Sequence, residues 1–190
     1  MNVFVLDESP VIAAQSQCDK HVVKMIVESG QMLSTAHRML DGTADRRPSK
    51  SGKRLIQHWS LNDVRECVLY KAVHMGHPCT VWTMQSSKNY IWHWEHLEAL
   101  CKEYTSRYGK VHKTEQDLLE ILRTMPTNIA NGDLTPWPLA MGAAPECINI
   151  SDVVGSYRKF YQTKQARFKM AWTNRAIPDW FKFADMELVL

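Results

Sequence analysis

Six polar residues between positions 21 and 38 recur at intervals of three and four. They are His21, Lys24, Glu28, Gln31, Thr35 and Arg38. On a helix this spacing places all six side chains on one face. The set combines an imidazole, a single carboxylate between basic groups, an amide, a hydroxyl and a guanidinium. Such groups can bind phosphate, transfer protons and hydrogen-bond a base edge. The alternative is an ordinary solvated face with the pair Lys24–Glu28.

The helix that must carry these residues is predicted from Asp19 to about Leu40, where Asp41-Gly42 ends it. Its other face is apolar at helical spacing, which predicts that it packs on the core. The apolar residues are Val22, Met25, Ile26, Met32, Leu33, Ala36 and Leu40. Gly30 interrupts this helix, and it permits either a bend or a close contact with another helix.

Capping, turn and periodicity signals divide the rest of the chain. We expect an extended segment at 2–6, a helix from Ser9-Pro10, a mobile basic loop at 41–54, helices at 54–73 and 81–108 with Gly109 as the cap, a helix from Thr114 to Pro126, a Pro-rich connection at 126–150, a helix from Asp152 to about 170, and a C-terminal tail at 171–190. The predicted fold is a compact, mainly α single domain over 1–190, with a short N-terminal extended segment and long irregular loops.

The formal net charge of +3 hides two strongly basic segments. Residues 43–54 carry a net charge of +4 and residues 158–182 a net charge of +6, so the remainder is acidic at −7. The cations of the first segment are Arg46, Arg47, Lys50, Lys53 and Arg54. This asymmetry is typical of a protein with an anionic partner, although solvated surface stretches would give the same composition.

Composition excludes several classes of protein. With 45% apolar and 23% charged residues, the chain is neither disordered nor collagen-like. The five cysteines are widely spaced without a C-x-x-C motif, which disfavours a disulfide scaffold and fits a reducing cytosol. We expect neither a signal peptide nor a membrane span.

Several short motifs resemble, in the same order, those of the bacteriophage pyrimidine-dimer DNA glycosylases of the endonuclease V type. Asp19-x-His21 with Glu28 seven residues after the histidine is similar to the family's catalytic helix. Gly76-His77 leads into a long helix with Cys101 near its end, and Pro178 to Phe183 is similar to the family's Pro-x-Trp-Tyr-Lys-Tyr ending. The chain also resembles small uncharacterised proteins of tailed phages.

The resemblance implies a compact helical DNA-repair enzyme that excises a damaged or modified base, with or without AP lyase activity, in the cytoplasm of the host cell. The nucleophile would be the α-amine, here that of Met1, and the catalytic carboxylate would be Glu28 with His21 beside it. The residues expected to bind nucleic acid, chiefly duplex DNA, are Lys24, Arg38, Arg46, Arg47, Lys50, Lys53, Arg54, Arg175, Trp180 and Lys182. We expect no cofactor and no metal.

The chain departs from the family's pattern at three positions. The family exposes a small residue by losing its initiator methionine, whereas Asn2 disfavours that removal here, so Met1 itself would supply the amine. Two arginines of the family's catalytic helix are replaced by Val27 and Gln31. These departures weigh against lyase activity more than against nucleic-acid binding.

Other constellations give alternative functions. The pairs His74/His77 and His93/His96 have the i,i+3 spacing of helical metal ligands, which would suit a metallohydrolase. The motifs His58-x-Ser60 and His112-x-Thr114 resemble those of two-histidine phosphoesterases, but they lack the adjacent strands which that chemistry needs. The remaining alternative is a non-enzymatic phage accessory protein that binds nucleic acid or a host protein.

Seven tryptophans are candidates for base stacking, although most fit the core better. Trp172 and Trp180 are exceptions because they lie among Lys169, Arg175 and Lys182. Aromatic residues interleaved with basic ones favour stacking together with phosphate contact. The alternative for this tail is that it docks on the core as a C-terminal anchor.

Overall fold

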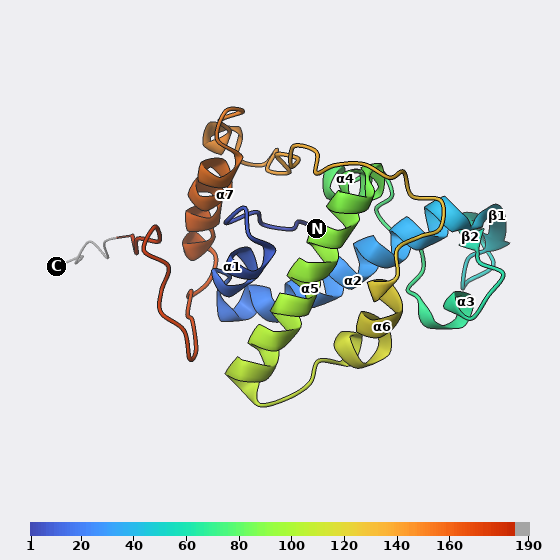
Figure 1. Cartoon of the computed structure of the whole chain (residues 1–190), viewed down its shortest axis with the longest axis horizontal. Coiled ribbons are helices and arrows are strands. Elements are labelled where there is room, and N and C mark those ends of the chain that lie inside the picture. The colour runs from blue at the N-terminus through green and yellow to red at the C-terminus, as the bar shows by residue number, and fades with distance from the viewer. Residues whose placement is uncertain (185–190) are drawn as a thin grey trace.

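The long helix α2 (Asp19–Asp41) runs through the middle of the molecule, and α5 (Ser87–Tyr108) crosses it (Figure 1). The computed structural model describes residues 1–184. The other helices are α1 (Pro10–Gln15), α3 (Arg65–Val68), α4 (Pro78–Gln85), α6 (Lys113–Arg123) and α7 (Val153–Gln162), with short 3-10 turns η1 (Pro145–Cys147) and η2 (Thr163–Ala166). The predicted compact, mainly helical fold is confirmed.

Local signals placed several helix ends correctly. Ser9 caps α1 by accepting a hydrogen bond from the Ile12 N–H, and Pro10 is the first helical residue. Helix α2 begins at Asp19 and ends before Gly42. Gly109 ends α5 with φ of 64°, a left-handed conformation that favours glycine. These ends depend only on neighbouring residues, so the sequence predicts them well.

Other ends differ from the prediction. The helix expected over 81–108 is two helices, because Ser86 is extended and caps α5. His112, rather than Thr114, caps α6. Helix α7 ends at Gln162 and continues as η2 to Ala166, short of the predicted end near 170.

The segment after α2 is a β-hairpin, where we predicted a loop over 41–54 and a helix over 54–73. Strand β1 (Thr43–Pro48) pairs antiparallel with β2 (Leu55–Ser60). Gly52, with φ of 71°, lies in the connection. The prediction of a helix there is wrong: the only helix between 54 and 73 is the single turn α3. Apolar and aromatic residues at 55, 56 and 59 suit a strand as well as a helix, so their spacing did not discriminate.

The apolar face of α2 forms the centre of the core, as predicted. Val22, Met25, Ile26 and Leu33 are fully buried. Gly30 permits the close contact with α6, because a Cβ atom there would lie 2.7 Å from Cγ2 of Thr114. Across residues 1–184, no helix is long and apolar enough to cross a membrane.

The N-terminal segment at 2–6 is buried and forms no strand. The extended run predicted there is interrupted at Phe4, which has a φ of 49° and whose carbonyl accepts the Leu6 N–H at 2.8 Å. The segment lies between α2 and α7, since the ring of Phe4 contacts His21 on one side and Phe160 and Tyr161 on the other. The N-terminus therefore lies near the centre of the molecule (Figure 1). This burial brings the first residues of the chain to the polar face of α2.

Candidate active site

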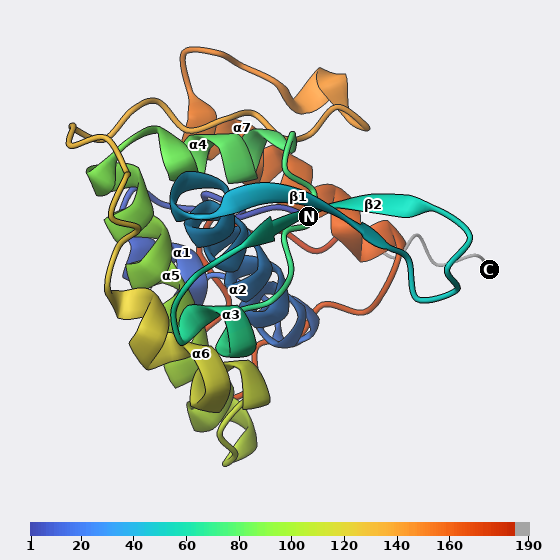
Figure 2. The ribbon, with the colours of Figure 1, turned by 90° about the vertical axis from the view of Figure 1, so that its right-hand side faces the viewer.

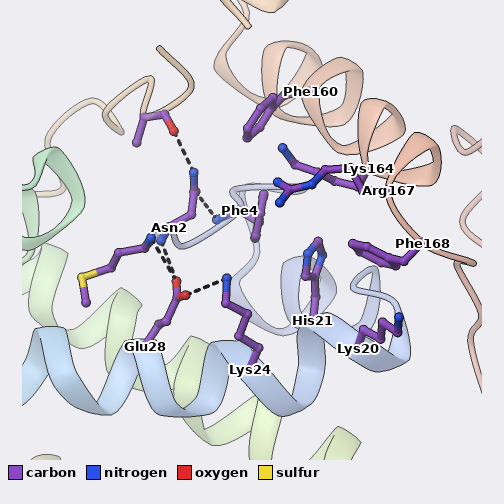
Figure 3. A pocket seen from close by; sticks show the side chains of 12 residues that line it. Asn2, Phe4, Lys20, His21, Lys24, Glu28, Phe160, Lys164, Arg167 and Phe168 are labelled. Atoms are coloured by element: carbon purple, nitrogen blue, oxygen red, sulfur yellow. Dashed lines mark hydrogen bonds and ion pairs between the residues drawn. The ribbon is translucent and has the colours of Figure 1, made fainter. Parts of the chain in front are cut away.

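A cleft of about 530 Å³ separates the first half of α2 from α7 and η2. Its volume lies in the range of small-molecule and cofactor sites. The residues that line it are Met1, Asn2, Phe4, Lys20, His21, Lys24, Glu28, Ala140, Phe160, Lys164, Arg167 and Phe168. Figure 3 shows the α2 side chains facing those of α7 and η2, with Asn2 and Phe4 between them.

Glu28 is the only carboxylate among these lining residues. Its Oε2 accepts a hydrogen bond from the backbone N–H of Asn2 at 2.9 Å and lies 3.6 Å from the amino nitrogen of Met1. Its Oε1 lies 3.0 Å from Nζ of Lys24, one turn earlier on α2. Only 12% of the Glu28 side chain is exposed. The carboxylate therefore contacts the amino terminus and a lysine together (Figure 3).

The chain start is fixed in place by several contacts. The Met1 side chain is buried and approaches the Thr80 hydroxyl of α4. Asn2 donates its side-chain amide to the Ala140 carbonyl at 2.8 Å and accepts the Phe4 N–H at 2.8 Å. Burial, followed by the positive amino group of Met1, lowers the pKa of His77. The amine is thus held beside Glu28 rather than free in solvent.

Phe4 has a strained backbone at the floor of the cleft. Its φ of 49° is left-handed, which is a genuine outlier for a bulky residue. Such a conformation costs about 1–3 kcal/mol and is found mostly at functional sites. The Phe4 ring stacks on that of His21, with centroids 4.8 Å apart.

His21 is a neutral group in this site. Its Nδ1 lies 2.7 Å from the Tyr161 hydroxyl. Burial, together with the charges of Lys24, Lys164 and Arg167, lowers its pKa to about 4. At neutral pH the imidazole therefore carries no charge for phosphate binding, but it can donate or accept one hydrogen bond.

The opposite wall combines cations with aromatic rings. Nζ of Lys164 lies 3.4 Å from the centroid of the Phe160 ring, and Nζ of Lys20 lies 4.9 Å from that of Phe168. Arg167 lies beside them (Figure 3). Burial and the charge of Arg167 lower the pKa of Lys164. A cleft of this kind can hold a flat ring and an anionic group together.

Sequence reasoning missed most of this wall. Lys164, Arg167 and Phe168 were not singled out, although the first two fall in the basic segment 158–182. Their charge was the available signal, but nothing local indicated that η2 would face α2. His77 was expected only in the Gly76-His77 motif and as a candidate metal ligand with His74, not beside the Met1 amine.

The predicted polar face of α2 divides into two environments. His21, Lys24 and Glu28 reach the cleft. Thr35 is buried, and its hydroxyl accepts the backbone N–H of Val73 at 3.1 Å. Gln31 is half-buried and lies outside the cleft. The six residues do lie on one face of α2, as their spacing predicts, but neighbouring elements cover the C-terminal half of that face.

Arg38 is a correction to the predicted nucleic-acid contacts. It is 1% exposed, and its guanidinium donates to the carbonyls of Trp59, Glu66, Leu69 and Tyr70 and to the Glu66 carboxylate. The backbone N–H of Leu61, and then Arg38, lower the pKa of Glu66 to about 2. Arg38 is therefore a structural residue that joins α2 to the base of the hairpin.

Replacing Arg38 by alanine is expected to destabilise the fold by about 3–5 kcal/mol, because four carbonyls and a carboxylate lose a buried charged partner. Urea unfolding measures this change. Arg46→Ala removes an exposed arginine and is the matched control, with an expected effect within about 0.5 kcal/mol. Equal stability of the two variants would contradict the structural role of Arg38.

The other predicted contacts are divided between the hairpin and the tail. Arg46, Arg47, Lys50, Lys53 and Arg54 are exposed on the hairpin, at the far end of α2 from Glu28. Arg175 is paired with Glu103, with the two atoms 3.0 Å apart (Nε to Oε2). Trp180 is half-buried, edge-on to Tyr161 and near the Arg158 guanidinium, while Lys182 is exposed.

The tail docks on the core through Trp172. Its ring is buried, and its Nε1–H donates to the Ser16 carbonyl at 2.9 Å. The sequence left open whether this segment stacks on bases or anchors the C-terminus to the core, and Trp172 serves as an anchor. The last part of the predicted tail, 185–190, lies outside the described residues.

The histidine pairs do not converge. His93 and His96 are fully buried in α5, where they bond Thr83 and Gln17 respectively. His77 instead lies close to the Met1 amine. In the part of the chain that the structure describes, no group of three or more His, Cys, Asp or Glu residues is placed to hold a metal ion. The arrangement expected of the metallohydrolase is therefore not found among residues 1–184.

No protein-family model matches the chain, and neither does any of the curated proteins or solved structures compared with it. Two features of the chain itself bear on its function: the geometry of the cleft and the motifs that resemble the phage glycosylases.

Proposed function

We propose that the protein is a DNA N-glycosylase whose nucleophile is the amino group of Met1. The observation that carries the proposal is the 3.6 Å approach of this amine to the Glu28 carboxylate in a cleft lined by cations and aromatic rings. An amine and a single carboxylate are the two groups that this reaction requires. Residues 19, 21 and 28 match the motif of the phage glycosylases, which supports the same assignment.

In the proposed reaction, the neutral amine attacks C1′ of the target nucleotide. The glycosidic bond breaks, and the base leaves with the electron pair and takes up a proton. Opening of the sugar ring gives a Schiff base between the amine and C1′. Glu28 stabilises the positive charge on the sugar and transfers protons. In the lyase branch, loss of a proton from C2′ breaks the C3′–O bond, and water then releases the amine.

An α-amine suits this chemistry better than an ordinary lysine. Its usual pKa of about 8 leaves a useful fraction unprotonated at neutral pH. Lys24 and Lys164 also line the cleft, so they are the competing amines. Both Met1 and Lys24 place an amine near Glu28, at 3.6 and 3.0 Å, so distance alone does not choose between them. The α-amine is favoured by its lower usual pKa and by the burial of the Met1 side chain, whereas the Lys24 side chain is 64% exposed.

The cleft also favours a base held outside the helical stack. C1′ is inaccessible inside a duplex, so enzymes that act on it generally extrude a nucleotide. Phe4, Phe160 and Phe168 offer apolar surfaces for a base, while Lys164 and Arg167 offer charges for its phosphate. The motif resemblance favours a pyrimidine dimer or another damaged or modified base as the substrate.

Two alternative functions fit the geometry less well. A purely binding protein would leave Glu28 exposed and paired with Lys24 alone, whereas Glu28 is largely buried and also contacts Met1 and Asn2. A metallohydrolase would bring its histidines together, and those of residues 1–184 do not meet.

Borohydride trapping tests the proposal directly. Protein is incubated with ultraviolet-damaged or abasic duplexes, and adducts are resolved by mass. We expect a covalent adduct with the native chain and with a chain extended after Leu190. Residues added before Met1 convert the amine to an amide, and we expect them to reduce trapping at least about 100-fold.

Each outcome of this experiment decides one point. Trapping that is unchanged by the N-terminal extension would overturn the assignment of the α-amine and implicate a lysine. Absence of both an adduct and base release from every damaged duplex would overturn the glycosylase proposal itself. Intact mass measured on the same samples shows whether Met1 is retained.

A further inference from the structure

The β1–β2 hairpin projects from the body of the molecule (Figure 2). Every residue of β1 is exposed, as are the first three residues of β2. A two-stranded hairpin on its own is marginally stable, and this one buries little apolar surface. Packing of the core therefore does not explain why the chain builds it.

The charge of the hairpin is strongly one-sided. Its five cations face a single acid, Asp45, which is neutralised by Arg47 at 2.9 Å. Lys50, Lys53 and Arg54 lie at or next to the turn and are exposed. The projecting end of the hairpin is thus positive without a compensating acid, which favours an anionic partner.

The register distinguishes the two faces of the hairpin. Asp45 pairs with His58, and His58 is buried against the Glu66 carboxylate at 3.3 Å, so this face is turned toward the protein. Alternation along a strand places Arg46 on the other face, directly opposite Gln57. The outward face therefore presents Arg46 beside Gln57, whose side-chain amide donates to the Asp45 carbonyl at 3.1 Å and leaves its Oε1 as the acceptor.

The base of the hairpin is firmly attached to α2. The buried Arg38 binds the Trp59 carbonyl of β2 at 2.9 Å and the Glu66 carboxylate at 2.6 Å. The same helix carries Glu28, thirteen residues before its last residue, Asp41, or about 20 Å at 1.5 Å per residue. Hairpin and cleft are thus held at a set separation of about six base pairs of duplex.

We propose that this hairpin enters the major groove of duplex DNA. Arg46 and Gln57 then face the base edges, while Lys50, Lys53 and Arg54 contact phosphates. The major groove of B-form DNA is about 12 Å wide and admits a two-stranded ribbon, and arginine and glutamine are the side chains that pair bidentately with guanine and adenine there.

Other nucleic acids fit the hairpin less well. The major groove of an RNA duplex is deep and too narrow for side chains to read. Single strands are bound chiefly by stacking on aromatic rings, whereas the hairpin's one tryptophan, Trp59, is half-buried at its base. Duplex DNA is therefore the partner that the geometry favours. The distance between the hairpin and the cleft predicts where the groove contact lies relative to a damaged base, and this prediction rests on the proposed glycosylase function. Groove binding itself does not depend on that function.

The first experiment measures binding to an undamaged DNA duplex at several salt concentrations by fluorescence anisotropy. The triple variant K50A/K53A/R54A is expected to lower the slope of log affinity against log salt by about 2.7, since each phosphate contact contributes about 0.9. The matched control K102A/K110A/K113A removes three exposed lysines elsewhere, and we expect an unchanged slope. Equal slopes for the two triple variants would overturn the proposal.

A second experiment places the hairpin in the groove. Methylation of guanine N7, which lies in the major groove, is expected to weaken wild-type binding at guanines about six base pairs from a single abasic site. The double variant R46A/Q57A is expected to lose this interference and to bind different duplex sequences with affinities that differ several-fold less. Interference that persists in the double variant would place the hairpin outside the major groove.

The outcomes separate this proposal from the catalytic one. The salt slope is measured without damaged DNA, so it stands whether or not an adduct can be trapped. Failure of the wild-type protein to trap an adduct would overturn the catalytic proposal and leave the salt slope unaffected. Circular dichroism of the variants checks that the fold is retained. Preferential binding of single strands by the wild-type protein would also overturn the proposal.

Discussion

Replacing Glu28 by glutamine is expected to lower the single-turnover rate of base release by about 100- to 10,000-fold, which is the usual contribution of a general acid–base group. Glutamine keeps the size of the side chain, and its carbonyl can still accept the Asn2 N–H. It cannot carry the negative charge that lies 3.6 Å from the Met1 amine. Both stabilisation of the sugar cation and proton transfer are then lost. Rapid-quench assays on a duplex with one damaged base measure this rate.

Glu98→Gln is the matched control. Glu98 and Lys102 form an i,i+4 pair on α5, as Lys24 and Glu28 do on α2, but they lie outside the cleft. The control is expected to retain the wild-type rate. A Glu28→Gln protein that binds DNA, melts near the wild-type temperature and still turns over normally would remove Glu28 from the mechanism. Loss of turnover in both variants would point to a general effect of charge.

Lowering the pH from 7 to about 4 is expected to remove most of the folding stability. Burial is the first cause that lowers the pKa of His21 and His37 to about 4 and that of His93 and His96 to about 3. The unfolded chain binds protons at these sites below about pH 6.5, whereas the folded chain does not. The stability contribution is therefore complete above pH 6.5 and is lost as the pH falls toward the folded values.

The size of this effect follows from the number of sites. A shift of one pKa unit corresponds to about 1.4 kcal/mol, so each histidine contributes roughly 3 kcal/mol or more. Four such sites approach the total stability of a typical domain, about 5–15 kcal/mol. Glu66, whose pKa is lowered from 4.5 to about 2, acts in the same direction as the pH falls from about 4.5 toward 2.

Urea unfolding at pH 7, 6 and 5 measures the pH slope. We expect the free energy of unfolding to fall from pH 7 to pH 5. The variant His96→Gln removes one buried titrating site, so we expect it to reduce the slope of unfolding free energy against pH by the equivalent of about one proton. His74→Gln removes an exposed histidine and serves as the control. A wild-type stability that does not change between pH 7 and 5 would contradict the neutral, buried state of these imidazoles.

The hairpin and Arg38 show where prediction from the sequence reaches its limit. The sequence located the basic residues at 46–54 correctly, but it did not predict that they project on paired strands. Strand pairing joins residues such as Arg46 and Gln57, which no local periodicity relates. Likewise, Arg38 and His21 follow the same spacing on α2. Only the packing of β2 and α3 over Arg38 decides that one is structural, while the other lines the cleft.

By itself, the sequence determined the elements whose signals are local. The helical period placed His21, Lys24 and Glu28 on one face, and the residues at Ser9, Pro10 and Gly109 set helix ends, because these effects act within about one turn. Tertiary structure alone decided that the chain start would meet this face. The contact between Asn2 and Glu28 spans 26 residues, and it exists because apolar residues 3–6 are buried between α2 and α7. Burial of that short segment, rather than any motif, brings the amine to the carboxylate.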